Sequence, residues 1–297
     1  MLRQHGLYPY RPMRGRPEFT WPGGAKLACF IAINVEVFPF AEGLSIDLAP
    51  RQPEPDVVNF SWRDYGNRVG IWRLLDALDA LDLPITALMN TALYDACPEI
   101  PAAFRVRGDE IAGHGRTNAE RQSDMSPEAE QMMIRACAER IAREEGAPPA
   151  GWMGPWVSET HATLPILVEE GFRYVMDWAS DDQPVWFDTP RGRILSMPYA
   201  RQTNDLPQLH GAKLTPWDYA QVLVDQFDEM LEQAEGEGAP PLVYSLSLHP
   251  FLVGQPYRLR HLKRALAHIA THRDRCWIAP AGAIAAFCET LPEGALG

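Results

Sequence analysis

The sequence predicts a single β/α barrel of seven or eight strand–helix units. From residue 25 onward, short apolar runs rich in β-branched residues alternate with longer segments of helical period. No Gly/Ser-rich or charged linker divides the chain, and 297 residues with 46% hydrophobic content suffice for one large core. A doubly wound open sheet is the alternative fold.

The expected elements follow one another along the whole chain. Strands are expected at residues 26–36, 84–90, 109–114, 151–156, 173–179, 193–198, 242–249 and 275–279. Helices are expected at residues 64–81, 98–106, 126–145, 161–170, 217–234, 258–271 and 281–291. The helix at 126–145 has both ends marked, because Ser126 before Pro127 is an N-cap signal and Gly146 is a stop signal.

Residues 1–24 are expected to form an extended N-terminal arm, and residues 25–297 the barrel domain. The arm mixes prolines with aromatic residues, which favours packing against the barrel or a neighbouring subunit. Long connections at 37–63, 180–192 and 199–216 follow expected strands. Because such loops lie on the catalytic face of a barrel, we expect them to roof a pocket with Phe38, Phe40, Trp62, Asp181, Asp182, Trp186, Arg201 and His210.

The charge balance narrows the class of partner. With 27 basic and 39 acidic residues, the net charge of −12 disfavours binding to nucleic acid or to an anionic membrane. No apolar run approaches the roughly 18 residues of a membrane helix, and the first residues lack the apolar stretch of a signal peptide. We therefore expect a cytoplasmic protein that binds a small molecule.

Three apolar runs each end on a side chain that can move a proton. LACFIAINVE ends on Glu36, DEIAGHG contains His114, and LVYSLSLHP contains His249. Parallel strands of a barrel present their C-terminal ends to one face, so these three residues are expected to meet in one pocket. Burial there is expected to raise the pKa of Glu36 and suit it to general-base catalysis. The alternatives are a surface carboxylate and structural histidines.

Other titratable residues carry weaker signals. His261, His268 and His272 lie on or beside a basic helix whose solvated face accounts for them. The acidic group in MDWASDD suits either a divalent cation or Asx turns, and the turns are favoured. Phosphate-binding glycine loops and the G-x-S-x-G elbow of serine hydrolases are absent from the sequence.

Six segments in order resemble the polysaccharide deacetylase (NodB-like) superfamily, in particular its branch of metal-free allantoinase-like and cyclic-imide-hydrolase-like enzymes. They are WPGGAKLACFIAINVE, DYGNRVGIWRLLDALDALDLPITALMN, DEIAGHGRTNAERQSDMSPEAE, GWMGPW, EEGFRYVMDWASDDQPVWF and YSLSLHPFLVGQPYR. The resemblance implies a deformed (β/α) barrel of about seven units. It also implies hydrolysis of carbon–nitrogen bonds other than peptide bonds.

The sequence departs from this family at the metal ligands. In the deacetylases the first strand ends in two adjacent Asp, a base and then a ligand, and the third carries His-x-x-x-His. Here these positions hold Glu36, Val37, His114 and Asn118, so two of the three ligands are missing. The resemblance therefore implies that no metal cofactor is needed. A zinc site rearranged around Asp181, Asp182 or His249 is the alternative.

The resemblance also suggests a role for each residue. Glu36 would take a proton from water, and His114 and Asn118 would hold the substrate carbonyl or its oxyanion. His249 would protonate the leaving nitrogen of a small cyclic amide, such as an imide, hydantoin or ureide. Residues expected to bind substrate are Asn118, Arg68, Tyr65, Trp156 and Asp182. A metal-dependent polysaccharide deacetylase and a catalytically inactive, ligand-binding barrel are the other hypotheses, and a homo-oligomer is expected.

Overall fold

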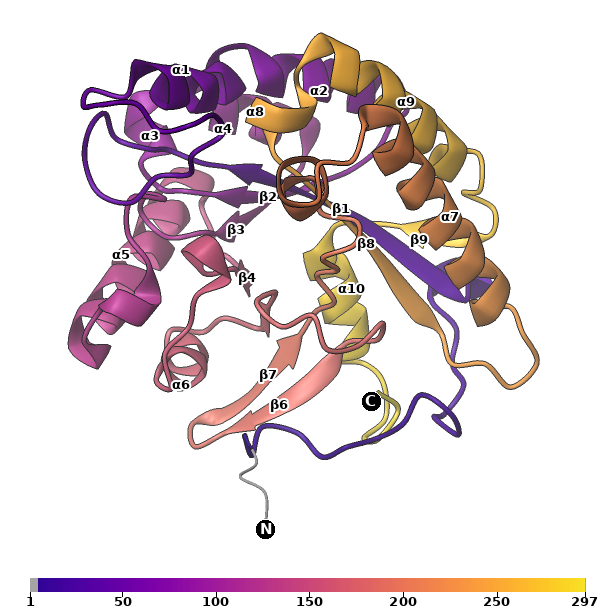
Figure 1. The fold of residues 1–297 in the computed structure, drawn as a ribbon. Helices are drawn as coiled ribbons and strands as arrows, with labels where there is room; N and C mark the ends of the chain where they lie inside the picture. The colour runs from indigo at the N-terminus through magenta and orange to yellow at the C-terminus, as the bar shows by residue number, and fades with distance from the viewer. Residues whose placement is uncertain (1–4, 297) are drawn as a thin grey trace.

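The computed structural model describes residues 5–296, which fold around one curled nine-stranded sheet (Figure 1). The strand order is β6-β7-β5-β4-β3-β2-β1-β8, and β9 pairs with the beginning of β1. All pairs are parallel except the antiparallel hairpin of β6 and β7. The strands are β1 (Leu27–Val35), β2 (Thr86–Met89), β3 (Glu110–Gly113), β4 (Gly151–Trp152), β5 (Tyr174–Val175), β6 (Val185–Thr189), β7 (Gly192–Ser196), β8 (Leu242–Leu248) and β9 (Cys276–Ile278).

The chain on either side of the β6–β7 hairpin closes this sheet onto β8. Before the hairpin, the carbonyl of Asp182 accepts a hydrogen bond of 2.8 Å from the main-chain N–H of Val243. After it, Asn204 forms an isolated parallel bridge with Ser247. The ring β7-β5-β4-β3-β2-β1-β8 therefore contains seven parallel strands. This confirms the predicted deformed β/α barrel of about seven units.

Helices surround the ring in the described part of the chain (Figure 1). They are α1 (Val57–Tyr65), α2 (Ile71–Asp79), α3 (Leu93–Ala96), α4 (Glu99–Arg107), α5 (Pro127–Glu145), α6 (Thr163–Glu169), α7 (Pro216–Ala234), α8 (Pro250–Val253), α9 (Pro256–Ala270) and α10 (Ala281–Cys288). The predicted caps of α5 are confirmed: the Ser126 hydroxyl accepts from the N–H of Ala129 at 3.3 Å, and Gly146 has φ 81°. Within residues 5–296, every helix is too short or too polar to cross a membrane.

Strand β1 separates two apolar cores, and all of its residues are buried. Its even-numbered residues, such as Phe30, join a core inside the barrel. Its odd-numbered residues, such as Ile31, join a second core that includes residues of α2, α7 and α9. Because side chains alternate along a strand, burial on both faces explains why the sequence reads as one continuous apolar run.

The strands expected at 151–156 and 173–179 are shortened to β4 and β5, of two residues each. Two other predicted elements also differ from the structure. Strand β6 lies inside residues 180–192, which were predicted as a loop, because the chain there turns back to pair with β7 instead of entering another β/α unit. The helix expected at 64–81 starts earlier, at Val57, because the Asp56 carboxylate accepts from the N–H of Asn59 and caps it. It then passes through a π-helical turn, Gly66–Gly70, into α2.

Residues 5–24 of the arm run along the N-terminal end of this chain's own barrel (Figure 1). Tyr8 stacks on Phe187 of β6 with ring centroids 4.8 Å apart. Trp21 is buried in the inner core, and its indole N–H donates to the carbonyl of Leu242 at 3.1 Å. The arm therefore covers the end of the barrel opposite to the C-terminal ends of its strands.

Candidate active site

Glu36, His114 and His249 meet at the C-terminal end of the barrel. Each follows the last residue of a ring strand, and neighbouring strands are in register there, because Val35 pairs with Met89. Ala32 of β1, Ala112 of β3 and Val243 of β8 point into the barrel, because all three belong to the inner core. The three site residues stand an even number of positions later, so strand alternation turns them toward the interior.

The three side chains are close together and almost fully enclosed. Glu36 Oε1 lies 3.5 Å from His114 Nε2 and 3.8 Å from His249 Nε2. The side chains of Glu36, His114 and His249 are only 7%, 1% and 4% exposed. Both distances exceed that of a normal hydrogen bond, so a water or a substrate atom can approach the carboxylate and either ring.

His114 is held in one tautomer. Its Nδ1 lies 2.8 Å from the carbonyl oxygen of Met153, and a carbonyl can only accept, so Nδ1 carries the proton. Nε2 is buried and has no hydrogen-bond partner within residues 5–296. A neutral His114 therefore offers Nε2 as an acceptor, which suits it to orient a water molecule.

His249 has a carboxylate partner that the sequence did not reveal. Its Nδ1–H donates to Asp205 Oδ1 at 2.6 Å, and its main-chain N–H donates to Oδ2 at 2.7 Å. Burial alone lowers the pKa of His249, but the charge and hydrogen bond of Asp205 and the charge of Glu36 raise it above the ordinary value. Burial raises the pKa of Asp205, yet both its oxygens accept hydrogen bonds, as a carboxylate does. His249 is thus prepared to act as an acid through Nε2.

Glu36 titrates in the direction opposite to the one predicted. Burial alone raises its pKa, as expected from the sequence. The polar contacts with the His114 ring and the Asn118 amide, together with the charge of His249, outweigh burial, so the pKa is lowered. Glu36 is therefore an ionised carboxylate at neutral pH, and the expectation of a raised pKa was wrong.

Asn118 is oriented by a chain of amide groups. The main-chain N–H of Val37 donates to Asn90 Oδ1 at 2.8 Å, and Asn90 Nδ2 donates to Asn118 Oδ1 at 3.1 Å. The N–H of Asn118 in turn donates to the carbonyl of Val37 at 2.9 Å. With its oxygen engaged, Asn118 presents its NH₂ group, a donor, to the cavity that it lines.

A cavity of about 450 Å³ lies above these residues. Trp156 forms part of its wall and donates from its indole N–H to the carbonyl of Asn118 at 3.0 Å. Trp156 has φ 66°, a left-handed conformation that is costly for a bulky residue and marks a constrained position. Roof residues from two of the long connections are Phe38, Ile46, Arg201, Leu206, Pro207 and His210.

Some predicted roof residues lie elsewhere. Phe40 packs on Phe60 with ring centroids 4.8 Å apart, and the Trp62 indole donates to the carbonyl of Phe251 at 3.0 Å. Trp186 is in β6, where the guanidinium of Arg193 covers its ring. Only the part of the roof nearest the strand ends was therefore predicted correctly.

Three predicted substrate-binding residues are outside the cavity. Arg68 is 74% exposed and lies 3.8 Å from Asp64, one helical turn earlier, while Tyr65 interacts with Arg73. Asp182 lies beside the first residues of β8, at the opposite end of the barrel from His249. These placements correct the expectation that Arg68, Tyr65 and Asp182 contact substrate, because helix faces and loop paths are not readable from residue types alone.

A second carboxyl pair, Glu159 and Asp177, borders the cavity through Asp177. Burial and the mutual repulsion of the pair raise the pKa of Asp177 well above its usual range, and burial raises that of Glu159 to about 7. Asp177 also accepts a hydrogen bond of 2.9 Å from the N–H of Gly154. The pair therefore holds a proton at neutral pH. Glu36, whose pKa is lowered, is by contrast ionised.

The residues around Glu36 do not form a ligand set for a divalent metal. Val37 packs against the core between β1 and the helices α2, α7 and α9, and the side-chain oxygen of Asn118 accepts a hydrogen bond from Asn90. His114 is the remaining residue of the ligand triplet that the family resemblance implies. Within residues 5–296, a cluster of three ligand-type residues close enough to hold one ion occurs elsewhere, on the outside of the barrel. Asp181, proposed as a substitute ligand, instead pairs with Arg16.

No family model matches the chain. It is similar to the solved structure of PuuE allantoinase, with a TM-score of 0.80, 27% identity, and coverage of 96% of this chain and 99% of that one. A Schizosaccharomyces pombe protein assigned to the polysaccharide deacetylases is 25% identical over 89% of this chain and 91% of its own length. These relatives support a place for the chain in the polysaccharide deacetylase (NodB-like) superfamily.

This superfamily also includes a Helicobacter pylori peptidoglycan deacetylase that is 24% identical over 72% of this chain and 82% of its own length. The curated relatives are named as deacetylases, and they support an amidohydrolase, an enzyme that hydrolyses carbon–nitrogen bonds. The solved structures thus share the barrel fold with this chain.

Proposed function

We propose that the protein hydrolyses a ring amide in a small cyclic substrate, an imide, hydantoin or ureide, without a metal ion. The main support is the pairing of an ionised Glu36 with an Asp205-backed His249 in one enclosed cavity. Environments that separate the pKa values of two such groups assign a base and an acid. The likeness to PuuE allantoinase favours a cyclic ureide or a related ring.

The first step is addition of water to the ring carbonyl. Water donates one hydrogen bond to Glu36 Oε1 and one to His114 Nε2, which stand 3.5 Å apart. Glu36 takes the proton as the water oxygen bonds to the carbonyl carbon. The NH₂ group of Asn118 donates to the oxygen that becomes negative. The sequence-based role of His114 changes here, since its tautomer makes Nε2 an acceptor and not an oxyanion donor.

The second step breaks the carbon–nitrogen bond. His249 gives the proton on Nε2 to the ring nitrogen as the bond to the carbonyl carbon breaks, and the ring opens to a carboxylic acid. Glu36 then holds the proton from water, and the 3.8 Å between its Oε1 and His249 Nε2 lets that proton return to His249. A nitrogen flanked by a second carbonyl is a better leaving group than that of an acetamide, so less Lewis-acid assistance is required.

The shape of the cavity supports a small substrate. Its volume of about 450 Å³ falls in the range of small-molecule sites. Phe38 and Ile46 from one loop and Leu206 and Pro207 from another cover it, whereas a long sugar polymer requires an open groove. We propose that Arg201, which lines the same cavity, replaces Arg68 as the group that binds a substrate carbonyl or carboxylate.

A substrate panel tests this function. We expect turnover of at least one imide, hydantoin, dihydropyrimidine or ureide, and no release of acetate from acetylated chito-oligosaccharides. Glu36→Gln should lower kcat by at least 10³-fold with the fold intact by circular dichroism, because the base is lost. Glu139→Gln, an exposed change on α5, is the control and should keep full activity. Deacetylation of the sugars, or near-normal activity of Glu36→Gln, would contradict the proposal.

A further inference from the structure

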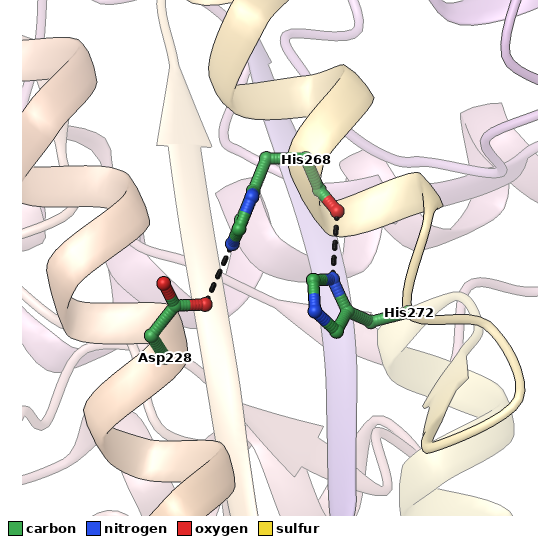
Figure 2. A group of neighbouring side chains, drawn as sticks. All are labelled: Asp228, His268 and His272. Carbon is green, nitrogen blue, oxygen red and sulfur yellow. Dashed lines mark hydrogen bonds and ion pairs between the residues drawn. The ribbon is translucent and has the colours of Figure 1, made fainter.

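A second group of metal-ligand side chains lies on the outside of the barrel, between α7 and α9 (Figure 2). Asp228 comes from α7, His268 from the last turns of α9, and His272 from the turn that follows α9. Each offers a ligand atom, and these atoms all lie within 4.8 Å of one another. None of the three lines the catalytic cavity, so the catalytic proposal leaves this cluster unused.

His272 is held in the tautomer that a metal requires. Its Nδ1 lies 2.9 Å from the carbonyl oxygen of His268, which can only accept, so Nδ1 carries the proton (Figure 2). The lone pair is therefore on Nε2. Donation of the second ring N–H to a main-chain carbonyl is the usual way in which proteins orient a metal-binding histidine.

His268 and Asp228 already face each other. The distance from His268 Nε2 to Asp228 Oδ1 is 2.6 Å, the length of a charge-assisted hydrogen bond. Two ligands of a tetrahedral ion at 2.0–2.1 Å stand about 3.3 Å apart, so the pair has to open by less than about 1 Å. The side chains of His268 and Asp228 are 31% and 49% exposed, which leaves them room to move.

Glu232 provides a candidate for the fourth ligand. It stands one helical turn after Asp228 on α7 and lines the same surface depression as Asp228, His268 and His272. Glu235 also lines it but is engaged with Arg275, whose Nε donates at 3.0 Å. Two helical segments thus each contribute two residues four positions apart, the histidines from one and the carboxylates from the other.

We propose that Asp228, His268 and His272, completed by Glu232, bind a divalent transition-metal ion, and that zinc is the best match. Two imidazoles with carboxylates suit zinc, whereas magnesium and calcium prefer oxygen ligands alone. The ion would fasten α7 to the C-terminal end of α9. Because it binds the folded state, it stabilises the protein without taking part in catalysis.

Zinc binding to the chelator-stripped, full-length protein tests this site. We expect one equivalent to bind in competition with a chromophoric chelator, and Tm to rise as zinc is added. His268→Ala combined with His272→Ala should remove both effects. His261→Ala, on the same helix but packed on Trp217, is the control and should keep them. Unchanged stoichiometry and an unchanged Tm rise in the double variant would overturn the proposal.

Further measurements distinguish loss of the zinc site from unfolding of the double variant and from zinc binding at the catalytic site. If the double variant is unstable, Asp228→Asn should reduce zinc affinity at least 10-fold while circular dichroism remains that of the wild type, since an amide is a poor ligand. Cobalt(II) as a probe should give the intense visible absorption of a four-coordinate ion in the wild type and not in the variants. Glu36→Gln should bind zinc as the wild type does, and loss of binding there would place the metal at the catalytic site instead.

Discussion

The central pair at the residue scale is Glu36 and His249. Both are buried, yet their environments stabilise the charged form of each, the carboxylate of Glu36 and the imidazolium of His249. Asp205 is responsible for much of this on the histidine side, through its charge and two hydrogen bonds. The proposed base and the proposed acid are therefore both in their reactive forms at neutral pH.

Replacing Asp205 by Asn should shift the alkaline limb of the pH profile. In the proposed mechanism His249 acts as the acid, so activity is present below its pKa and is lost as pH rises through that pKa. The negative charge of Asp205 raises the pKa of His249, so Asp205→Asn should lower it and move the alkaline limb of kcat/KM to lower pH. The loss should be about 10-fold or more at pH 8 and smaller at pH 6.

The matched control is Asp82→Asn, a fully exposed aspartate whose replacement should leave the profile unchanged. Measurement of kcat/KM from pH 5 to pH 10 checks both variants. An alkaline limb that stays in place in Asp205→Asn would show that His249 is not the acid.

Sequence alone was sufficient for residues at strand ends and insufficient for residues in loops. Glu36, His114 and His249 could be predicted, because strand alternation and parallel strands bring such endings to one face. Asp205 could not, since it lies in an irregular connection 44 positions before His249 and looks like a turn residue. Arg68 was misplaced because an arginine in a helical segment points to solvent as readily as to a pocket.

At the scale of elements, α8 is positioned by close contact with the turn Gly66–Gly70. A Cβ atom on Gly70 would lie 2.2 Å from the carbonyl oxygen of Pro250, and one on Gly254 would lie 2.3 Å from the Cα of Gly70. Glycine is therefore required for two helical backbones to meet here. Since Pro250 directly follows His249, this contact also fixes the end of β8 and the ring of the catalytic histidine.

We predict that Gly70→Ala lowers the free energy of unfolding by about 1–3 kcal/mol, because the added methyl group overpacks this contact. It should also lower kcat by displacing His249, with a smaller effect on KM. Gly236→Ala is the control, since its Cβ would come no closer than 3.2 Å to a neighbouring atom. Urea denaturation and steady-state kinetics measure the two effects, and a fully active, fully stable Gly70→Ala variant would contradict this account.

The hairpin strand β6 is an element that could not be predicted from the sequence. The alternation of apolar runs and helical segments predicts one strand per β/α unit, and β6 belongs to no such unit. Its pairing with β7 is antiparallel and depends on a return of the chain that residue types between Pro184 and Pro190 do not specify. The seven ring strands, by contrast, follow from the period of the sequence.

At the scale of the whole molecule, the two ends of the barrel have different tasks. The C-terminal end carries the residues proposed to react, whereas the N-terminal end is closed by α10 and by the arm. Trp21 is 1% exposed and packs with Phe287 of α10 at a centroid distance of 5.4 Å. This aromatic packing fills the N-terminal end of the interior core.

We expect Trp21→Ala to lower the free energy of unfolding by about 3–5 kcal/mol, because it leaves a large cavity in the inner core. Tyr10→Ala in the same arm should change stability little, since Tyr10 is 89% exposed. Chemical denaturation of both variants checks this. Equal stability of Trp21→Ala and the wild type would mean that the arm does not close the barrel.

The most direct test of the central claim is the activity of metal-stripped wild-type protein on its preferred cyclic amide. After exhaustive treatment with a strong chelator, verified by elemental analysis, we predict an unchanged kcat/KM, because Glu36, His249 and Asn118 supply the base, the acid and the oxyanion donor. A loss of activity that zinc restores, both in the wild type and in the His268→Ala and His272→Ala double variant, would contradict the account and establish a catalytic metal.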